Sequence, residues 1–361
     1  MSIYSRVFSF FLMLLTSVSC NSAVNTEIET VRGARKDSLA LVRQGGFCWE
    51  LDERTIPDIQ SVSYDAESGT LYFFNAITRK IEMFDIRSGR KETLVKPPAM
   101  PWSMNVLSRD SIYVLDLDNT RILLLDDGGT VKDTVPVNRS STLLPGSSGQ
   151  PYVTRDALYY VAAHSKREVS AYSVEPVSGE VQPLIPYPDT YRRNFYGYLL
   201  MNTPYSTFNQ ARGLIVTGYP VDGHIYVYDV GGKTLRRYAL ESRYHSRIET
   251  VPRNVLPEKE IEYFRENTTY ANILYDRYRD VYYRIVEKST PMPGVNLSNR
   301  AKKLSVIIVG PDFGILGETD ISEDMDASFR YTAFVSEEGL NLQLLTSEDE
   351  LSFATYIVKP L

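Results

Sequence analysis

The stretch from Leu71 to Gly89, "LYFFNAITRKIEMFDIRSG", has two apolar runs joined by a short polar turn, and it ends in aspartate and glycine. Runs rich in aromatic and branched residues, bounded by turn residues, predict a β-hairpin. The same arrangement recurs as "IYVLDLDNTRILLLDDGG" from Ile112, "LYYVAAHSKREVSAYSVEPVSG" from Leu158 and "LIVTGYPVDGHIYVYDVGG" from Leu214. These copies indicate an internal repeat.

Each hairpin is preceded by another short strand and followed by a more polar one, so the unit has four antiparallel strands. Such repeats are typical of β-propeller blades. Six units begin near Ile59, Trp102, Gln150, Ser206, Tyr270 and Ser328. The sequence therefore predicts an all-β, six-bladed β-propeller. Two alternatives stay open: a sandwich of unrelated hairpins, and a seven-bladed ring in which residues 30–55 supply more than one strand.

A glycine closes the hairpin after the third strand in five units. Tight hairpin turns need a residue at positive φ, which glycine adopts without a Cβ clash. We therefore expect positive φ at Gly89, Gly129, Gly179, Gly232 and Gly314.

The last unit has only three strands before the chain ends. An open blade would leave strand edges unpaired. The segment from about Asp37 to Gly46, "DSLALVRQGG", is predicted to supply the missing strand and to clasp the two chain ends together. Residues 37–361 are thus expected to form a single propeller domain.

The N-terminus has the features of an export signal. Arg6 precedes the apolar run "VFSFFLMLL", and small residues lead to Cys20. Residues 1–19 are read as a signal peptide, and Cys20 resembles the acylated cysteine of a bacterial lipobox. Cleavage by an ordinary signal peptidase is the alternative. We expect residues 20–36 to be a lipid-anchored linker. The protein is then expected to be a cell-envelope lipoprotein of the outer membrane, attached by this anchor and facing either the periplasm or the cell surface.

Composition argues against several kinds of partner. The net charge is −6 and no dense basic run is present, so nucleic acid is not an expected partner. His164, His224 and His245 stand apart without metal-ligand spacing, and no metal, cofactor or catalytic residue is assigned. If Cys20 carries lipid, Cys48 is the only other cysteine and is expected to be a small buried residue.

Long segments fall between strands two and three or between blades, which places them on one face of the disc. Loops on a rigid scaffold commonly carry recognition, so this face is the expected working surface. The candidate binding residues are Trp102, Tyr191, Arg192, Arg193, Tyr196, Tyr205 and Arg279. The alternative is that the tyrosine rings form a small core over the blades. Residues 257–267 are predicted to form a short amphipathic helix within one insertion.

The segment from Thr268 to Lys288, "TTYANILYDRYRDVYYRIVEK", resembles the signature of a bacterial lipoprotein family catalogued as domain of unknown function 4221. The matching residues are Tyr270, Tyr275, Asp276, Tyr278, Arg279, Tyr282, Tyr283 and Arg284. The resemblance implies an exported, TolB-like or NHL-like six-bladed propeller and supplies no catalytic residue. From the residues themselves, Asp276 with Arg277 and Arg279 is expected to form an ion-paired latch beside a turn.

The favoured hypothesis is a binding or scaffolding module for a protein, peptide or glycan. The rival hypothesis is a hydrolase or lyase acting on a carbohydrate or lactone. Carboxylates or histidines converging at the channel mouth would favour an enzyme. An aromatic and arginine floor without such a cluster would favour binding.

Overall fold

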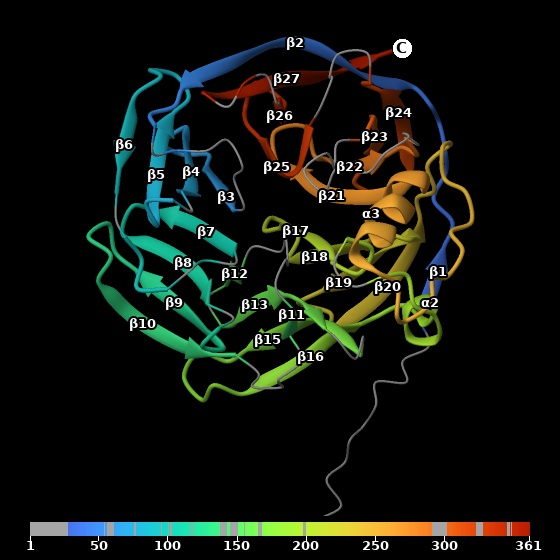
Figure 1. Cartoon of the computed structure of the whole chain (residues 1–361). Coiled ribbons are helices and arrows are strands. Elements are labelled where there is room, and N and C mark those ends of the chain that lie inside the picture. The colour runs from blue at the N-terminus through green and yellow to red at the C-terminus, as the bar shows by residue number, and fades with distance from the viewer. Residues whose placement is uncertain are drawn as a thin grey trace, which may run out of the picture.

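The computed structural model describes residues 28–53, 55, 61–75, 77–94, 96–99, 101, 103–116, 118–137, 143–144, 151–154, 156–164, 168–197, 200–290, 302–322, 328–344, 347 and 349–361. Six four-stranded antiparallel arrangements surround a central axis (Figure 1). This confirms the six-bladed propeller.

Blades are numbered along the chain, and each runs outward from the axis. Blade 1 is β3 (Val62–Asp65), β4 (Thr70–Asn75), β5 (Lys80–Asp85) and β6 (Lys91–Thr93). Blade 2 is β7 (Ser103–Ser108), β8 (Ser111–Asp116), β9 (Arg121–Leu125) and β10 (Val131–Pro136). Blade 3 is β12 (Tyr152–Val153), β13 (Leu158–Val161), β15 (Val169–Val174) and β16 (Val181–Pro186), beside the pair β11 (Leu143–Leu144) and β14 (Ala163–His164).

Blade 4 is β17 (Tyr205–Asn209), β18 (Leu214–Tyr219), β19 (Asp222–Asp229) and β20 (Thr234–Ala239). Blade 5 is β21 (Thr269–Asp276), β22 (Val281–Glu287), β23 (Leu304–Val309) and β24 (Ile315–Asp320). Blade 6 is β25 (Ser328–Val335), β26 (Leu340–Leu344), β27 (Glu350–Pro360) and, outermost, β2 (Leu39–Glu50).

Blade 6 is completed by the N-terminal strand, as predicted. β2 pairs antiparallel with β27 from Leu39 opposite Pro360 to Glu50 opposite Glu350. The strand therefore runs beyond the predicted end at Gly46. Because strands from the two ends of the chain lie in one sheet, their pairing closes the ring.

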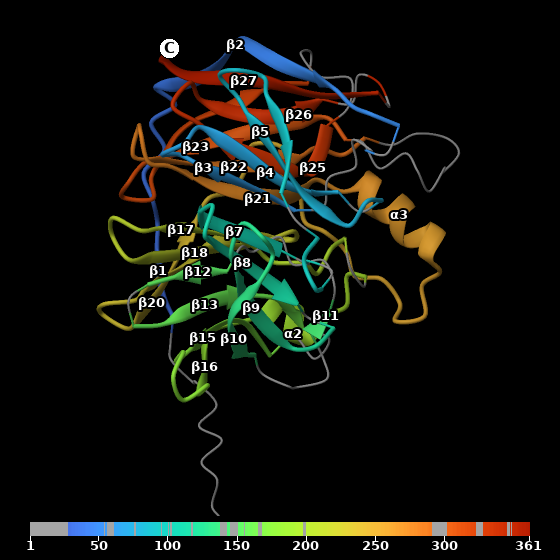
Figure 2. The same cartoon turned by 90° about the vertical axis from the view of Figure 1, so that its left-hand side faces the viewer.

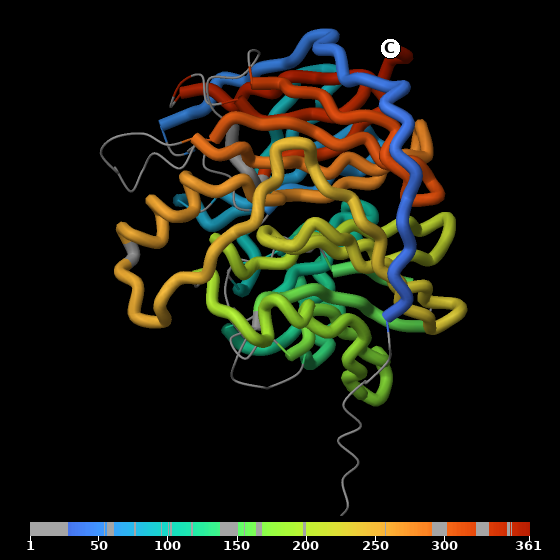
Figure 3. Tube along the Cα trace, turned by 90° about the vertical axis from the view of Figure 1, so that its right-hand side faces the viewer, coloured from blue at the N-terminus to red at the C-terminus, as the bar shows by residue number. Residues whose placement is uncertain are grey.

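A segment ahead of β2 also lies against the propeller. β1 (Glu29–Val31) adds a parallel fifth strand to β20 of blade 4. The chain then follows β24 of blade 5, where the Lys36 amide donates to the Ile315 carbonyl at 2.9 Å. Figure 3 shows this segment, residues 29–38, along the outer rim; we call it the N-terminal strap. Much of the segment expected as a linker is thus packed on blades 4 and 5.

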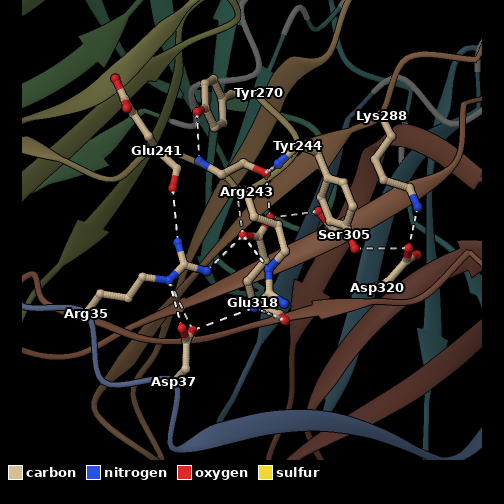
Figure 4. A network of polar contacts seen from close by, with 11 residues as sticks. Arg35, Asp37, Glu241, Arg243, Tyr244, Tyr270, Lys288, Ser305, Glu318 and Asp320 are labelled. Carbon is tan, nitrogen blue, oxygen red and sulfur yellow. Dashed lines mark hydrogen bonds and ion pairs between the residues drawn. The ribbon is translucent and has the colours of Figure 1, made fainter. Parts of the chain in front are cut away.

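A buried carboxylate joins the strap to the blades (Figure 4). The Glu318 side chain is fully buried on β24 and accepts from Ser242 Oγ at 2.5 Å and from the Arg243 amide at 2.8 Å. Arg35 of the strap adds an ion pair at 3.3 Å, and Ser305 Oγ donates at 3.1 Å. One carboxylate therefore ties together the strap, blade 5 and the link between blades 4 and 5.

The hairpin turns explain the repeated aspartate. Asp85 Oδ1 accepts from the amides of Arg87 at 2.8 Å and Ser88 at 3.0 Å, which is the Asx-turn chemistry that favours aspartate. Positive φ is confirmed at Gly89, Gly129 and Gly179. The prediction of positive φ is wrong for Gly232 and Gly314.

In blades 4 and 5, Lys233 and Phe313 hold the positive φ instead of Gly232 and Gly314. Glycine is required at positions 232 and 314 for a different reason. A Cβ on Gly232 would lie 2.9 Å from Asp229 Oδ2, and one on Gly314 would lie 3.1 Å from the Ala34 carbonyl oxygen of the strap. Close approach of other atoms, and not backbone conformation, therefore explains glycine at these positions.

The described long insertions gather on one face. α3 (Pro257–Glu266) projects from that face in Figure 2, and it confirms the predicted helix. A second helix, α2 (Asp189–Arg193), lies in the link between blades 3 and 4 and was not predicted. Lys302 Nζ donates to the Phe264 carbonyl at 2.9 Å and the Asn267 carbonyl at 2.5 Å, which holds the end of α3 against the disc.

Candidate functional site

A cavity of about 850 Å³ occupies the central channel. All six innermost strands line it, and residues of the turns that follow these strands, such as Glu67, Gln210 and Arg277, form one end. We call this end the cavity mouth. The lining includes no described residue of the long insertions. The cavity therefore lies toward the short-turn face, opposite the face that the sequence marked as the working surface.

Side chains from neighbouring blades satisfy the channel-facing strand edges. In an isolated blade, the inner edge of the first strand would leave backbone groups unpaired. Here a side chain of one blade pairs with the backbone of the next. The contacts are the Val106 amide to Ser63 Oγ (2.9 Å), Asn105 Nδ2 to the Pro151 carbonyl (2.8 Å), Tyr152 OH to the Ser206 carbonyl (3.1 Å) and the Tyr275 amide to Thr207 Oγ1 (3.1 Å).

The deeper part of the cavity is polar but uncharged. Ser61, Ser103, Ser206 and Asn272 line it from blades 1, 2, 4 and 5, and each is at most 7% exposed. The hydroxyl oxygen of Ser103 has no hydrogen-bond partner among the described residues, and that of Ser206 makes no hydrogen bond of normal geometry, although it lies close enough to interact with the buried Tyr152 hydroxyl. Buried hydroxyls are normally paired, so these two serines leave hydrogen-bonding capacity beside the cavity that the protein does not fully use.

Aromatic rings surround the upper part of the cavity. Tyr64 packs on Phe334 at 5.2 Å between ring centroids, and Tyr152 packs on Phe208 at 5.1 Å. Burial raises the pKa of Tyr64 to about 12, with smaller contributions from Tyr278 and Glu338. This phenol is therefore neutral at physiological pH, and the aromatic wall carries no charge.

Charged lining residues occur only at the mouth. They are Asp65, Glu67 and Arg277. Asp65 is engaged in its own turn, where it accepts from the Glu67 amide at 3.0 Å and from Ser68 Oγ at 2.6 Å. The lining contains no histidine, and no cluster of metal-ligating side chains occurs in the parts of the chain that are described. The described lining is therefore charged at the mouth and uncharged below it.

Three predicted binding tyrosines are buried in the protein. Tyr191, Tyr196 and Tyr205 are 1%, 6% and 0% exposed. Tyr191 donates to the Met201 carbonyl at 2.8 Å and accepts from the Val221 amide at 3.0 Å. These rings form the small core expected as the alternative to a binding surface, so in this conformation they contact protein.

The predicted basic residues are placed differently. Arg192 and Arg193 are exposed on α2, and both pair with Asp189. Arg279 pairs with Asp276 at 3.0 Å and donates to the Glu337 carbonyl at 2.8 Å, so it links blade 5 to blade 6. None of these residues lines the cavity. Trp102 and Cys20 lie outside the described residues.

The "YDRYRDVYYR" stretch is mainly structural. Asp276 accepts from the Tyr278 and Arg279 amides and from Tyr283 OH at 2.7 Å, which confirms the predicted latch with Arg279, although no contact joins Arg277 to it among the described interactions. Tyr282 packs between blades 4 and 5 and Tyr283 between blades 5 and 6, as strand alternation predicts.

Arg284 holds blade 5 to blade 4. It is 1% exposed and donates to the carbonyl oxygens of Asp222 (2.6 Å), Gly223 (2.8 Å), Leu240 (3.0 Å) and His224 (3.2 Å). Its guanidinium carbon also lies 3.5 Å from the centre of the Tyr270 ring. The buried cation is thus stabilised by carbonyl dipoles and a π face.

The buried environment of His245 leads us to expect that the stability of the folded protein depends on pH. Its ring lies 5.1 Å from the Tyr270 ring, and its Nδ1 is buried without a partner among the described residues. Burial, then the nearby Arg284 cation, lower the pKa of His245 below its usual value, against smaller opposing effects of Glu241 and Asp222.

Below about pH 6.5 the unfolded chain therefore binds a proton that the folded chain resists, and stability falls as pH falls. The slope from this residue is at most about 1.4 kcal/mol per pH unit. We expect His245→Gln to reduce the fall, measured by urea unfolding between about pH 7 and pH 5. Equal slopes in both proteins would contradict this assignment.

The fold and cavity together define a six-bladed β-propeller with an uncharged, partly aromatic central site. The sequence model described as "Domain of unknown function (DUF4221)" matches residues 98–320. The chain belongs to this family.

Solved structures agree with the fold. A DUF4221 family member from Bacteroides vulgatus ATCC 8482 is 22% identical, with 91% of this chain and 100% of that chain covered and a TM-score of 0.74. A protein named "Putative exported protein" from Bacteroides fragilis NCTC 9343 is 8% identical, with 92% and 99% covered and a TM-score of 0.57. No curated protein matches the chain. None of the described helices is both long and apolar enough to span a bilayer.

Proposed function

We propose that the protein is a binding module whose ligand enters the central cavity from the short-turn face. The observation that carries this is the cavity of about 850 Å³ that all six innermost strands line and whose deep lining is polar and uncharged. Its volume is within the range of small-molecule sites. The scaffold around it is held by cross-blade hydrogen bonds and by a closed ring, so the site is preformed.

Filling the cavity tests this proposal. We expect native mass spectrometry of protein purified from its own envelope to show a bound mass that is lost in Ser206→Trp, because the indole would occupy the deep cavity. Arg193→Ala, on α2 and away from the lining, should keep the mass. A mass retained in Ser206→Trp with an intact unfolding transition would contradict the cavity as the site.

We further propose that acylated Cys20 anchors the propeller to the cell envelope, in the outer membrane. The apolar run before Cys20 and the family resemblance support this. We expect Cys20→Ser to abolish incorporation of labelled palmitate and to move the protein from the membrane fraction to the soluble fraction. A variant that stays membrane-bound would contradict the anchor.

A further inference from the structure

We propose that the ligand of the central cavity is a neutral oligosaccharide. This inference rests on the proposed function and adds the chemical class of the ligand. It follows from three properties of the lining: its charge, its hydrogen-bonding groups and its aromatic faces.

The charge of the lining excludes an ionic ligand at depth. Below the mouth, the lining side chains are hydroxyls, amides, aliphatic groups and aromatic rings. A charged group buried there would find no counter-ion, and burying an unpaired charge is strongly unfavourable. The deep site therefore suits a ligand that is polar and uncharged.

The serine hydroxyls match the hydroxyls of a sugar. Ser103 and Ser206, on blades 2 and 4, can each donate one hydrogen bond and accept others. A sugar hydroxyl has the same dual capacity, so it can pair with either serine in either direction. Both oxygens have almost no accessible surface, so each serine side chain would rotate toward the cavity to form such a bond, which would then lie away from competing water.

Aromatic rings lie above these hydroxyls. Tyr64, Phe208 and Tyr278 line the cavity toward the mouth, and Tyr278 is 39% exposed. The π face of a ring carries partial negative charge, which attracts the polarised C–H groups on the flat face of a pyranose. The site thus combines hydroxyl partners at depth with stacking surfaces at its entrance.

The same geometry disfavours an extended peptide. A peptide commonly binds a sheet by adding a strand to a free edge. At four places around the channel, edge groups already bond side chains of the neighbouring blade, as with the Val106 amide on Ser63 and the Tyr275 amide on Thr207. These positions offer a peptide backbone no partner.

Binding to arrayed neutral oligosaccharides, acidic oligosaccharides and unmodified peptides tests the proposal with the full-length protein. We expect binding to one or more neutral oligosaccharides. Ser206→Ala, which removes only a hydroxyl, should raise the Kd at least about tenfold, because a buried sugar hydroxyl loses its partner. Tyr278→Ala should weaken binding similarly, and Tyr278→Phe should bind within a few-fold of the parent because the ring remains.

Ser246→Ala is the matched control for the serine variant, since Ser246 is exposed in the link between blades 4 and 5 and is absent from the lining. Unfolding curves identify any variant that fails to fold. Binding only to peptides or to acidic oligosaccharides would overturn the inference, as would unchanged affinity in both Ser206→Ala and Tyr278→Ala. A native bound mass that disappears in Ser206→Trp but is not a carbohydrate would overturn the sugar assignment while leaving the proposed function standing. The absence of any bound mass together with no array binding would overturn both.

Discussion

Replacing Arg284 by methionine is expected to destabilise the propeller by about 3 kcal/mol. The side chain is fully buried and supplies donors to four carbonyl oxygens on blade 4 and the link after it. Methionine fills a similar volume and removes the cost of burying a cation, but it cannot donate to these carbonyls. Loss of the donors should outweigh the recovered desolvation, because the guanidinium is well paired in the native state.

Urea unfolding measures this effect. The free energy of unfolding of Arg284→Lys should lie between those of the parent and Arg284→Met. An ammonium group keeps the charge but lacks the planar set of donors with which guanidinium bonds several carbonyls at once. The control is Arg236→Met on β20. The Arg236 side chain is 55% exposed and pairs with Glu29, so its replacement should lower the free energy of unfolding by less than about 1 kcal/mol. Equal effects of Arg284→Met and Arg236→Met would show that the buried cation does not hold the blades together.

Ser352→Cys is expected to form a disulfide with Cys48 and to stabilise the fold by about 4 kcal/mol. Cys48 lies directly opposite Ser352 in the pairing of β2 with β27, and Ser352 Oγ is 3.1 Å from Cys48 Sγ. The two positions are 304 residues apart in sequence, so the cross-link would restrict a very long loop of the unfolded chain.

Intact mass and thiol counting, in a Cys20→Ser background, follow formation of the bond. We expect no free thiol after mild oxidation, and a stabilisation that disappears with reductant. Lys359→Cys, on the same strand but opposite Ala40, should keep two free thiols as a monomer. If Ser352→Cys formed only intermolecular disulfides, the register of the closing strand would be wrong.

The repeat could be predicted from the sequence because the pattern of each blade depends on residues that are close together in the chain. Strand alternation and the aspartate at the hairpin turn depend on neighbours in sequence, as at Asp85. Closure by the N-terminal strand followed from the missing strand of blade 6. Cys48 was expected to be buried and is exposed, because Trp49 on the same strand faces the core and alternation turns Cys48 outward.

The candidate site could not be predicted from the sequence, because its residues are brought together by long-range contacts and not by local patterns. Ser103 and Ser206 are ordinary strand residues, and only closure of the ring brings them to one cavity. A signal existed in retrospect: small or polar residues lie at or near the start of the innermost strand at Ser61, Ser103 and Ser206, and in the first half of β21 at Asn272. We predicted binding residues in the tyrosine-rich insertion instead, but its tyrosine rings pack against other residues of the protein. Composition alone cannot distinguish a buried tyrosine core from an exposed binding surface.

The strap was missed because residues 29–36, its part ahead of the predicted strand, show no strand alternation. Its position depends on long-range partners, such as the Arg35 contact with Glu318. A short parallel pairing of this kind leaves little local pattern in the sequence.

We propose that the channel, and not the face with the long insertions, is the working site. The most direct measurement is an experimental structure of the protein purified from its own envelope with its ligand retained. We predict ligand density in the channel within hydrogen-bond distance of Ser103 or Ser206 and beneath the ring of Tyr278. Density against α3 or α2, with the channel holding only water, would contradict the account.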